Sequence, residues 1–386
     1  MYGTSEIVDA AATVDAERTA FRRTEKLYKL YKTQAPKSWK NQAHRKADLS
    51  GVIDFHSVLE SFKLCGATPA GIFKYECRGF NRPVFCFEER PGFYFIPGAL
   101  TDDEQVHWIR ESLISFPQPP NRTNHTEAYG PIFGLFDAVQ NNKVLVEANS
   151  TSSEVDRILG YDKTNLNSKR FSFSEYCMFT NNDESYKSVA ASLLLRKLRW
   201  STLGLQFDWS KRNYAVSLPH KRMPDDLCLV AKKMAVPAMP NGEEFQPEAA
   251  IVNYFGPGDM LGGHLDDMEK DWSKPIVSIS LGCKAIFLLG GKSREEIPIA
   301  MFLRSGDIVL MAGEARECFH GVPRIFTDSE HADNVDLLSQ FSNEADLCFR
   351  EYIRTSRINI NIRQNLFSHW ILEFTLLEKI LVLDET

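Results

Sequence analysis

The chain has 386 residues, of which 43% are apolar and 25% are charged, and its formal net charge is −6. This composition excludes wholesale disorder, and the acidic balance gives no global sign of nucleic-acid binding. The eight cysteines include no Cys-x-x-Cys pair, so we expect reduced thiols and an intracellular protein. We expect no membrane contact, because no stretch reaches the roughly 18 uninterrupted apolar residues of a membrane span.

The first 50 residues are expected to form a basic N-terminal extension. Between Arg22 and Lys46 the sequence carries nine Lys or Arg and one acid, Glu25. Apolar residues at helical spacing in the first half of this segment predict an amphipathic helix. Two interpretations stay open, a solvated helix that packs one face on the domain and an arm that contacts phosphates. The acids among residues 1–20 argue against a typical mitochondrial transit peptide.

Residues 51–190 are assigned to an N-terminal region with helices and long loops. The pattern predicts a strand at 92–97, a helix at 100–115, and loops with some short helices over 117–190. Beyond this region we expect a helix end at 193–198, an aromatic strand at 200–209 and a helix at 224–234. Aromatic and basic residues alternate around the aromatic strand, which suits stacking on a base while phosphates are held. The alternative is that these aromatic side chains are core residues.

From residue 249 onward the sequence changes to short apolar runs separated by Gly-rich or Pro-containing turns. The expected strands are 250–255, 276–281, 285–289, 308–311 and 357–363. Many short strands with such turns indicate an antiparallel sandwich or barrel, the jelly-roll type among them. We place the catalytic domain at 191–366, a surface insertion at the acidic stretch 327–346, and a C-terminal tail at 367–386.

His264-Leu265-Asp266 and His320 are the candidate metal ligands. On a strand, side chains at i and i+2 point to the same face, so His264 and Asp266 are expected to reach one ion together. His320, following a later strand, supplies a third ligand. Two histidines and one carboxylate with open positions form the facial triad of non-haem Fe(II) oxygenases.

An Arg-rich strand near the end of the domain completes the constellation. Arg357, Asn359, Asn361 and Arg363 lie two residues apart and share one strand face, while three isoleucines fill the other. Buried guanidinium groups require anionic partners, so this face implies a bound dianion or an internal Asp or Glu. The far carboxylate of 2-oxoglutarate would suit the two-donor geometry of arginine.

Several of these motifs occur in an order that strongly resembles the AlkB family of iron- and 2-oxoglutarate-dependent dioxygenases. They are Asn253-Tyr254-Phe255, His264-Leu265-Asp266, Lys274 to Gly282, Leu289-Gly290-Gly291, Ser305-Gly306-Asp307, His320 and Arg357-x-Asn359-x-Asn361-x-Arg363. Two upstream segments, 47–55 and 198–204, look like the AlkB homologue 1 branch. The match of several spaced motifs over roughly residues 198–365 is specific.

The resemblance implies an α+β protein with a double-stranded β-helix (jelly-roll) core and an N-terminal helical extension. It implies Fe(II), 2-oxoglutarate and dioxygen as cofactor and co-substrates, and a methylated base of tRNA or DNA flipped into the pocket, with formaldehyde and succinate released. The implied site has His264, Asp266 and His320 as catalytic metal ligands, Asn253, Tyr254, Phe255, Arg357, Asn359 and Arg363 around 2-oxoglutarate, and Trp200, Leu205 and Phe207 at the base.

Two departures from the family pattern concern the pocket. Phe255 stands where the family usually has a second Tyr hydroxyl, so one hydrogen bond of about 1 kcal/mol to 2-oxoglutarate is missing. Met268 stands where the bacterial protein has an acid that reads the base. Two other functions are kept as alternatives, a protein or histone hydroxylase or demethylase on the same fold, and a catalytically weak nucleic-acid-binding relative. We expect a monomer in nucleus and cytoplasm, and the resemblance adds the mitochondrion.

Overall fold

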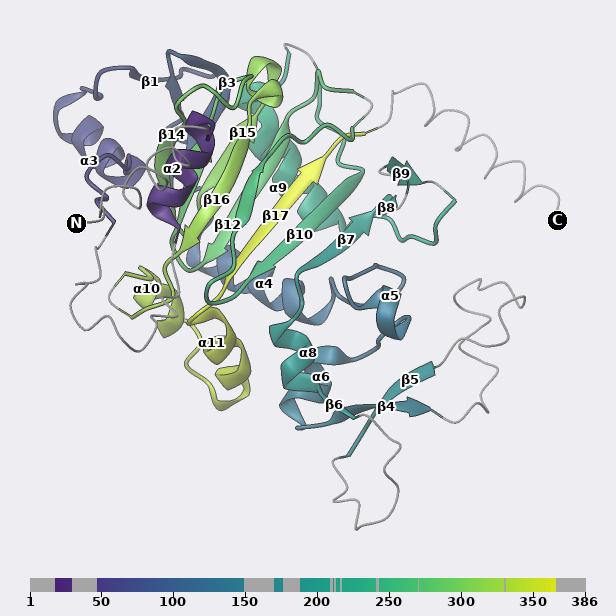
Figure 1. Cartoon of the computed structure of the whole chain (residues 1–386). Helices are drawn as coiled ribbons and strands as arrows, with labels where there is room; N and C mark the ends of the chain where they lie inside the picture. Colours follow the sequence, from purple (N-terminus) through teal and green to yellow (C-terminus); the bar gives the residue numbers. More distant parts are fainter. Residues whose placement is uncertain are drawn as a thin grey trace, which may run out of the picture.

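Two antiparallel sheets facing each other form the centre of the molecule (Figure 1). The computed structural model describes residues 18–29, 47–148, 170–175, 188–208, 211, 213–215, 217–240, 243–269, 271–329 and 331–365. The expected tail at 367–386 lies outside the described residues, as does most of the extension at 1–50. In the described part of the chain, no helix is long and apolar enough to cross a bilayer.

The larger sheet has eight strands in the described residues and the smaller one has four. The order in the larger sheet is β1 (Ile72–Lys74), β2 (Phe85–Phe87), β3 (Arg90–Ile96), β15 (Ile308–Met311), β12 (Ile276–Gly282), β17 (Arg357–Arg363), β10 (Ala249–Phe255) and β7 (Trp200–Gly204). The order in the smaller sheet is β11 (Leu261–His264), β16 (His320–Ile325), β13 (Ala285–Leu289) and β14 (Ile299–Leu303). This arrangement confirms the expected jelly-roll core.

The helices α4 (Asp102–Ile114) and α9 (Asp225–Ala235) lie behind the larger sheet, and the helices α6 (Leu135–Gln140), α8 (Ala191–Arg196) and α11 (Leu347–Ile353) lie at one end of its strands (Figure 1). Ile358, Ile360 and Ile362 of β17 are fully buried in the apolar cluster between this sheet and the helices. Alternation along β17 therefore sends its polar residues to the opposite face, between the two sheets.

The expected helix at 100–115 is present as α4, and its start follows from local chemistry. The Thr101 side chain accepts a hydrogen bond from the Glu104 amide, and the Glu104 side chain accepts one from the Thr101 amide. This capping box satisfies two amides that would otherwise lack partners at the first turn. Trp108 and Leu113 on one side of α4 are buried in the cluster under the larger sheet.

The region 117–190 holds more regular structure than the loops and short helices that the sequence predicts. Besides the short helices α5 (Thr126–Tyr129) and α6, it contains β4 (Val144–Ala148), β5 (Arg170–Ser174) and β6 (Val189–Ala190), which form a separate sheet. The expected single strand at 200–209 is divided, because Gly204 adopts a φ of +65°. Its second part, β8 (Gln206–Asp208), pairs with β9 (Asn213–Ala215) instead.

The acidic stretch 327–346, which the sequence predicts to be a surface insertion, has a few buried residues that pack on the domain. It contains α10 (Val335–Ser339) and a short 3₁₀ turn at Glu344–Asp346. Phe341 is buried against the helical layer, and the buried Asp346 forms an ion pair of 2.5 Å with Arg110 on α4. The acidic composition favours solvent exposure, but one acidic side chain, Asp346, is buried and fixes the segment to α4 through Arg110.

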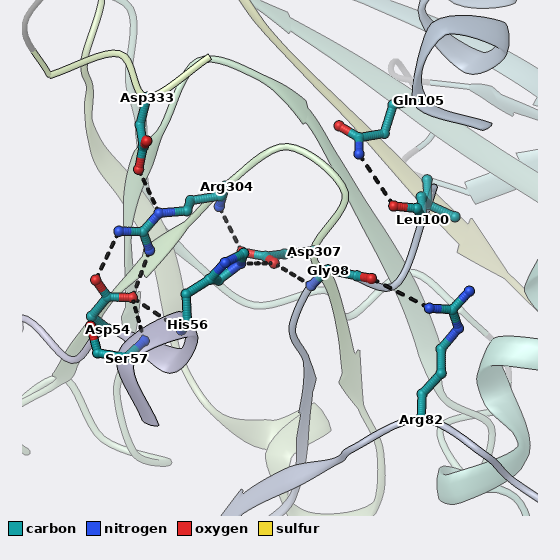
Figure 2. A network of polar contacts seen from close by, with 10 residues as sticks. All are labelled: Asp54, His56, Ser57, Arg82, Gly98, Leu100, Gln105, Arg304, Asp307 and Asp333. Atoms are coloured by element: carbon teal, nitrogen blue, oxygen red, sulfur yellow. Dashed lines mark hydrogen bonds and ion pairs between the residues drawn. The ribbon is translucent and has the colours of Figure 1, made fainter. Parts of the chain in front are cut away.

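The helix α3 (Phe55–Cys65) is tied to the turn between β14 and β15 by a polar network (Figure 2). The Arg304 guanidinium donates to both oxygens of Asp54, at 2.7 and 2.8 Å, and to Asp333. Asp307 is fully buried and lies 2.7 Å from the His56 ring. This pairing raises the pKa of His56, although burial of the ring opposes the shift. The Ser305-Gly306-Asp307 motif therefore anchors α3.

Candidate active site

The three candidate metal ligands meet between the two sheets. His264 and His320 are directly opposite each other in the register of β11 and β16. Asp266 lies 3.7 Å from His264 and 3.5 Å from His320, and one donor atom from each residue lies within 4.8 Å of the others. The structure corrects the strand placement, because β11 ends at His264, Asp266 follows it in irregular chain, and His320 begins a strand instead of following one.

Both imidazole rings are oriented for metal binding through Nε2. Nδ1 of His264 lies 2.9 Å from the Gly262 carbonyl, and Nδ1 of His320 lies 3.3 Å from the Cys318 carbonyl. A carbonyl only accepts, so each Nδ1 carries the proton and each Nε2 offers a lone pair to the cluster. Burial lowers the pKa of His264 to about 4, which keeps this ring neutral. Neutral imidazoles are the form that binds a metal.

Asp266 is held as a carboxylate by Arg363. Burial alone would raise the pKa of Asp266, but the Arg363 guanidinium at 3.0 Å holds it well below its ordinary value. Two neutral nitrogen donors and one ionised oxygen donor are the set that Fe(II) oxygenases use. The residues therefore fit the metal that the sequence pattern implies.

Arg363 has anionic partners from the chain itself. Besides Asp266, it forms an ion pair of 3.1 Å with Glu269 and donates a hydrogen bond of 2.9 Å to the Tyr214 hydroxyl. Burial opposes the charge, but these anionic and polar neighbours raise the pKa of Arg363. Glu269 also pairs with the buried Arg316 at 2.8 Å. Arg363 therefore has the internal carboxylate partners that the sequence predicts for a buried guanidinium, namely Asp266 and Glu269.

Arg357, six residues earlier on the same strand face, has no such partner. Its side chain is 1% exposed, and Nη2 donates to Ser280 Oγ at 3.1 Å. Nε and Nη1 have no hydrogen-bond partner among the described residues. Burial lowers the pKa of Arg357 to about 10. A buried, unpaired guanidinium is costly, so the site fits a carboxylate supplied by a ligand.

The remaining residues predicted around 2-oxoglutarate divide between the two faces of β10. Asn253 and Phe255 are opposite Asn359 and Arg357 in the register, which places them on the face between the sheets. Phe255 belongs to the apolar cluster there. Asn359 donates to Ser278 Oγ and to the Ile279 carbonyl, both at 2.9 Å, which fixes its amide.

The prediction that Tyr254 contacts the co-substrate is wrong. Tyr254 is 1% exposed and lies in the cluster beneath the helices, on the other face of the sheet. Its hydroxyl donates to the Ser112 carbonyl of α4 at 2.6 Å and lies 3.1 Å from Ser201 Oγ. Adjacent strand residues point to opposite faces, so Tyr254 anchors α4 to β10.

The three residues predicted at the base also separate. Trp200 is opposite Asn253 in the register, at the edge strand β7 of the pocket face. Leu205 and Phe207 are buried in a small cluster with Tyr214, against which Met268 packs. The Phe207 and Tyr214 rings meet edge to face at 5.2 Å. Tyr214 of this cluster accepts a hydrogen bond from Arg363, which places the cluster on the Arg363 side of the site.

Three functional-site residues were not predicted: Tyr214, Glu269 and Arg316. Tyr214 lies on β9, and nothing local to its sequence shows that it meets Arg363. Glu269 had a usable signal, because a buried arginine requires an acid and Glu269 lies three residues after Asp266. Arg316 has no such signal, since the turn that carries it reaches Glu269 only through the fold.

Comparisons with known proteins agree with this geometry. Residues 164–363 match the family model of the 2OG-Fe(II) oxygenase superfamily. The chain is 59% identical to the DNA N(6)-methyladenine demethylase ALKBH1A of Arabidopsis thaliana over 94% of this chain and 99% of the relative. It is 30% identical to the human nucleic acid dioxygenase ALKBH1, over 92% and 87%. It is 37% identical to the tRNA demethylase abh1 of Schizosaccharomyces pombe, over 73% and 81%.

These similarities cover nearly the whole chain and include the segment that carries the triad and the Arg-rich strand. The donor set at His264, Asp266 and His320 fits Fe(II), as the superfamily requires. The chain therefore belongs to the AlkB family of Fe(II)- and 2-oxoglutarate-dependent dioxygenases, in its AlkB homologue 1 branch.

Proposed function

We propose that this dioxygenase oxidatively demethylates N-methylated bases in nucleic acid. The observation that carries the proposal is Arg357, which has no ion pair and lies on the same strand face as Arg363, the residue that contacts the metal-ligand candidate Asp266. A dicarboxylate that chelates a metal at one end and meets a guanidinium at the other suits this arrangement. The relatives named as demethylases of DNA and of tRNA point to nucleic acid as the substrate class.

In this proposal the side chains have separate roles. His264, Asp266 and His320 hold Fe(II), and Arg357 binds the far carboxylate of 2-oxoglutarate. Asn253, Asn359 and Arg363 line the rest of that pocket, and Arg363 also keeps Asp266 ionised and oriented. Bound Fe(II), with 2-oxoglutarate and dioxygen, supplies the oxidation, which releases succinate, carbon dioxide and, from an N-methyl group, formaldehyde.

The base enters a pocket with an apolar wall. Met268, where an acid reads the base in the bacterial protein, packs against the cluster of Leu205, Phe207 and Tyr214. Glu269 is not free to read a base, because it is buried between Arg316 and Arg363. Recognition therefore relies on stacking and shape, with Trp200 at the pocket edge as the proposed stacking residue. Because flipping a base costs a few kcal/mol, unpaired or looped bases are the preferred sites.

A panel of methylated substrates tests this proposal. Formaldehyde and succinate are measured with Fe(II) and 2-oxoglutarate on tRNA, stem-loop RNA, single-stranded DNA and duplex DNA. His264→Ala serves as the blank, and His331→Ala, at a half-exposed histidine away from the triad, serves as the matched control. Formaldehyde that depends on both the nucleic acid and His264 supports demethylation. Succinate without formaldehyde on every substrate would instead favour a protein hydroxylase.

The monomeric state and the compartments, nucleus, cytoplasm and mitochondrion, stay predictions. Sedimentation of the full chain tests the first, and localisation of a tagged chain tests the second. Deleting residues 22–46 would be an ambiguous test of nucleic-acid binding by the basic segment. The deletion also removes Glu25, which accepts a hydrogen bond from the Gly263 amide beside His264.

A further inference from the structure

The N-terminal helix α2 (Ala20–Tyr28) packs on the outer face of the smaller sheet, over β16 and beside β11 (Figure 1). Phe21 is fully buried there, and its backbone amide donates to the Arg294 carbonyl at 2.9 Å. The Phe21 ring lies so close to Gly263 and Gly290 that a Cβ on either glycine would overlap it. The helix is therefore seated directly behind the strand that carries His264.

Glu25 is the polar link between this helix and the metal-bearing strand. Its side chain is 2% exposed, and Oε1 accepts a hydrogen bond of 3.0 Å from the Gly263 amide, one residue before His264. The other carboxylate oxygen pairs with Arg22 on the same helix. Burying a carboxylate is costly unless it is paired and hydrogen-bonded, and both conditions are met here.

Arg294 holds the same residue from its carbonyl side. Its Nη2 donates to the Gly263 carbonyl at 2.7 Å, and its guanidinium lies 4.4 Å from the centre of the Phe319 ring. The Gly263 carbonyl belongs to the peptide bond that leads into His264. Glu25 and Arg294 together therefore fix both polar groups of the residue before the metal ligand.

These contacts compensate for a weak strand. β11 has four residues, lies at the edge of the smaller sheet, and loses its regular register with β16 between Leu261 and His264. A bulge leaves backbone groups of an edge strand without ladder partners, and glycine in a strand adds conformational freedom. Without an external support, the His264 ring would be poorly fixed against Asp266 and His320.

We propose that Glu25 and Arg294 are positioning residues of the metal centre, so that α2 pre-organises His264 for the ion. The inference rests on the proposed role of His264 as a metal ligand. Groups that orient metal ligands from outside the coordination sphere typically change affinity by about 10–100-fold when they are removed. We expect Glu25→Ala and Arg294→Ala each to weaken metal affinity by about tenfold.

The test measures equilibrium Mn(II) affinity of the full-length chain in the presence of 2-oxoglutarate, together with the visible spectrum of the Co(II)-loaded protein. Glu25→Gln retains a carbonyl acceptor for the Gly263 amide and should restore affinity and spectrum to near the unsubstituted level. Leu27→Ala, at a residue 54% exposed on the same helix, is the matched control and should change neither. Because Arg294 lies outside α2, its variant tests the same backbone even if Glu25→Ala impairs folding.

The outcomes are separable. Loss of affinity in Glu25→Ala and Arg294→Ala, with recovery in Glu25→Gln, supports the positioning role. Unchanged affinity and spectrum in a folded Glu25→Ala or Arg294→Ala variant would overturn it. If His264→Ala itself binds Mn(II) as tightly as the unsubstituted chain, the proposed metal centre fails instead.

Discussion

Replacing Arg357 with methionine should make the protein more stable and, at the same time, unable to bind 2-oxoglutarate. Among the described residues, Arg316, Arg357 and Arg363 are the buried arginines, and Arg357 is the one of these without an ion pair. Its charge is therefore uncompensated until a ligand arrives. Methionine has a similar length, fills irregular space and leaves no donor unpaired.

The magnitude follows from the hydrogen bonds of Arg357. An unsatisfied buried polar group costs about 1–3 kcal/mol, and Nε and Nη1 are both unpartnered. The hydrogen bond to Ser280 is lost in the variant, which costs about 1 kcal/mol. Relief of two unsatisfied groups, less the lost hydrogen bond, gives a net gain of about 1–5 kcal/mol, equivalent to a rise in Tm of about 1–6 °C in a chain of this length.

Thermal unfolding with and without 2-oxoglutarate, on Mn(II)-loaded protein, measures both effects. At 100 times its Kd the co-substrate stabilises the unsubstituted chain by about 2.7 kcal/mol, and Arg357→Met should lose this response. The matched control is Arg363→Met, which removes the guanidinium partner of Asp266 and leaves Glu269 with Arg316 alone. That variant should lose about 3–5 kcal/mol. If Arg357→Met melts lower than the unsubstituted chain, or still responds to 2-oxoglutarate, the reasoning is refuted.

Three further substitutions have distinct expected results. Tyr254→Phe should lower the free energy of unfolding by about 1–3 kcal/mol, because the Ser112 carbonyl loses its donor. The same variant should leave the Kd of 2-oxoglutarate unchanged, and a higher Kd would show that Tyr254 contacts the co-substrate. Phe255→Tyr should restore a hydroxyl worth about 1 kcal/mol and lower that Kd about fivefold in calorimetric titration. The bond to Asp307 raises the pKa of His56 in the folded state, so its stabilisation is complete below the unfolded pKa of about 6.5 and is lost as pH rises through the folded value. In urea unfolding, His56→Asn should therefore reduce the difference in stability between pH 6 and pH 8.5, and an unchanged difference would contradict this assignment.

Parts of both sheets were predictable because several of their strands carry a strong local pattern. The strands at 285–289, 308–311 and 357–363 match the structure residue for residue, since buried strands require runs of branched apolar residues. β11 and β16 were not predicted as strands. The sequence Leu261-Gly262-Gly263-His264 has no β-branched residue, and glycine weakens a strand signal. These strands exist because α2 and their sheet neighbours support them.

The grouping of His264, Asp266 and His320 was predictable from the sequence, but the different environments of Arg357 and Arg363 were not. The two residues are chemically identical and lie on one strand face, and their difference comes from Tyr214 and Glu269, which the fold brings to Arg363 alone. The error at Tyr254 has another origin. The period of two that separates the faces of β17 also places Tyr254 on the face opposite Asn253, so its position was predictable from the strand alone.

The basic N-terminal segment shows how charge counting can hide a buried acidic residue. Against nine basic residues, the single acid Glu25 looks like a minor exception. The fold buries it, and its carboxylate meets the amide beside His264. Arg23, on the exposed side of the same helix, faces solvent away from the sheet, so its charge is available to a phosphate without affecting that contact. A phosphate-binding role of this helix is therefore tested by reversing the Arg23 charge, and a metal-positioning role by removing Glu25, because each change leaves the other face of α2 intact.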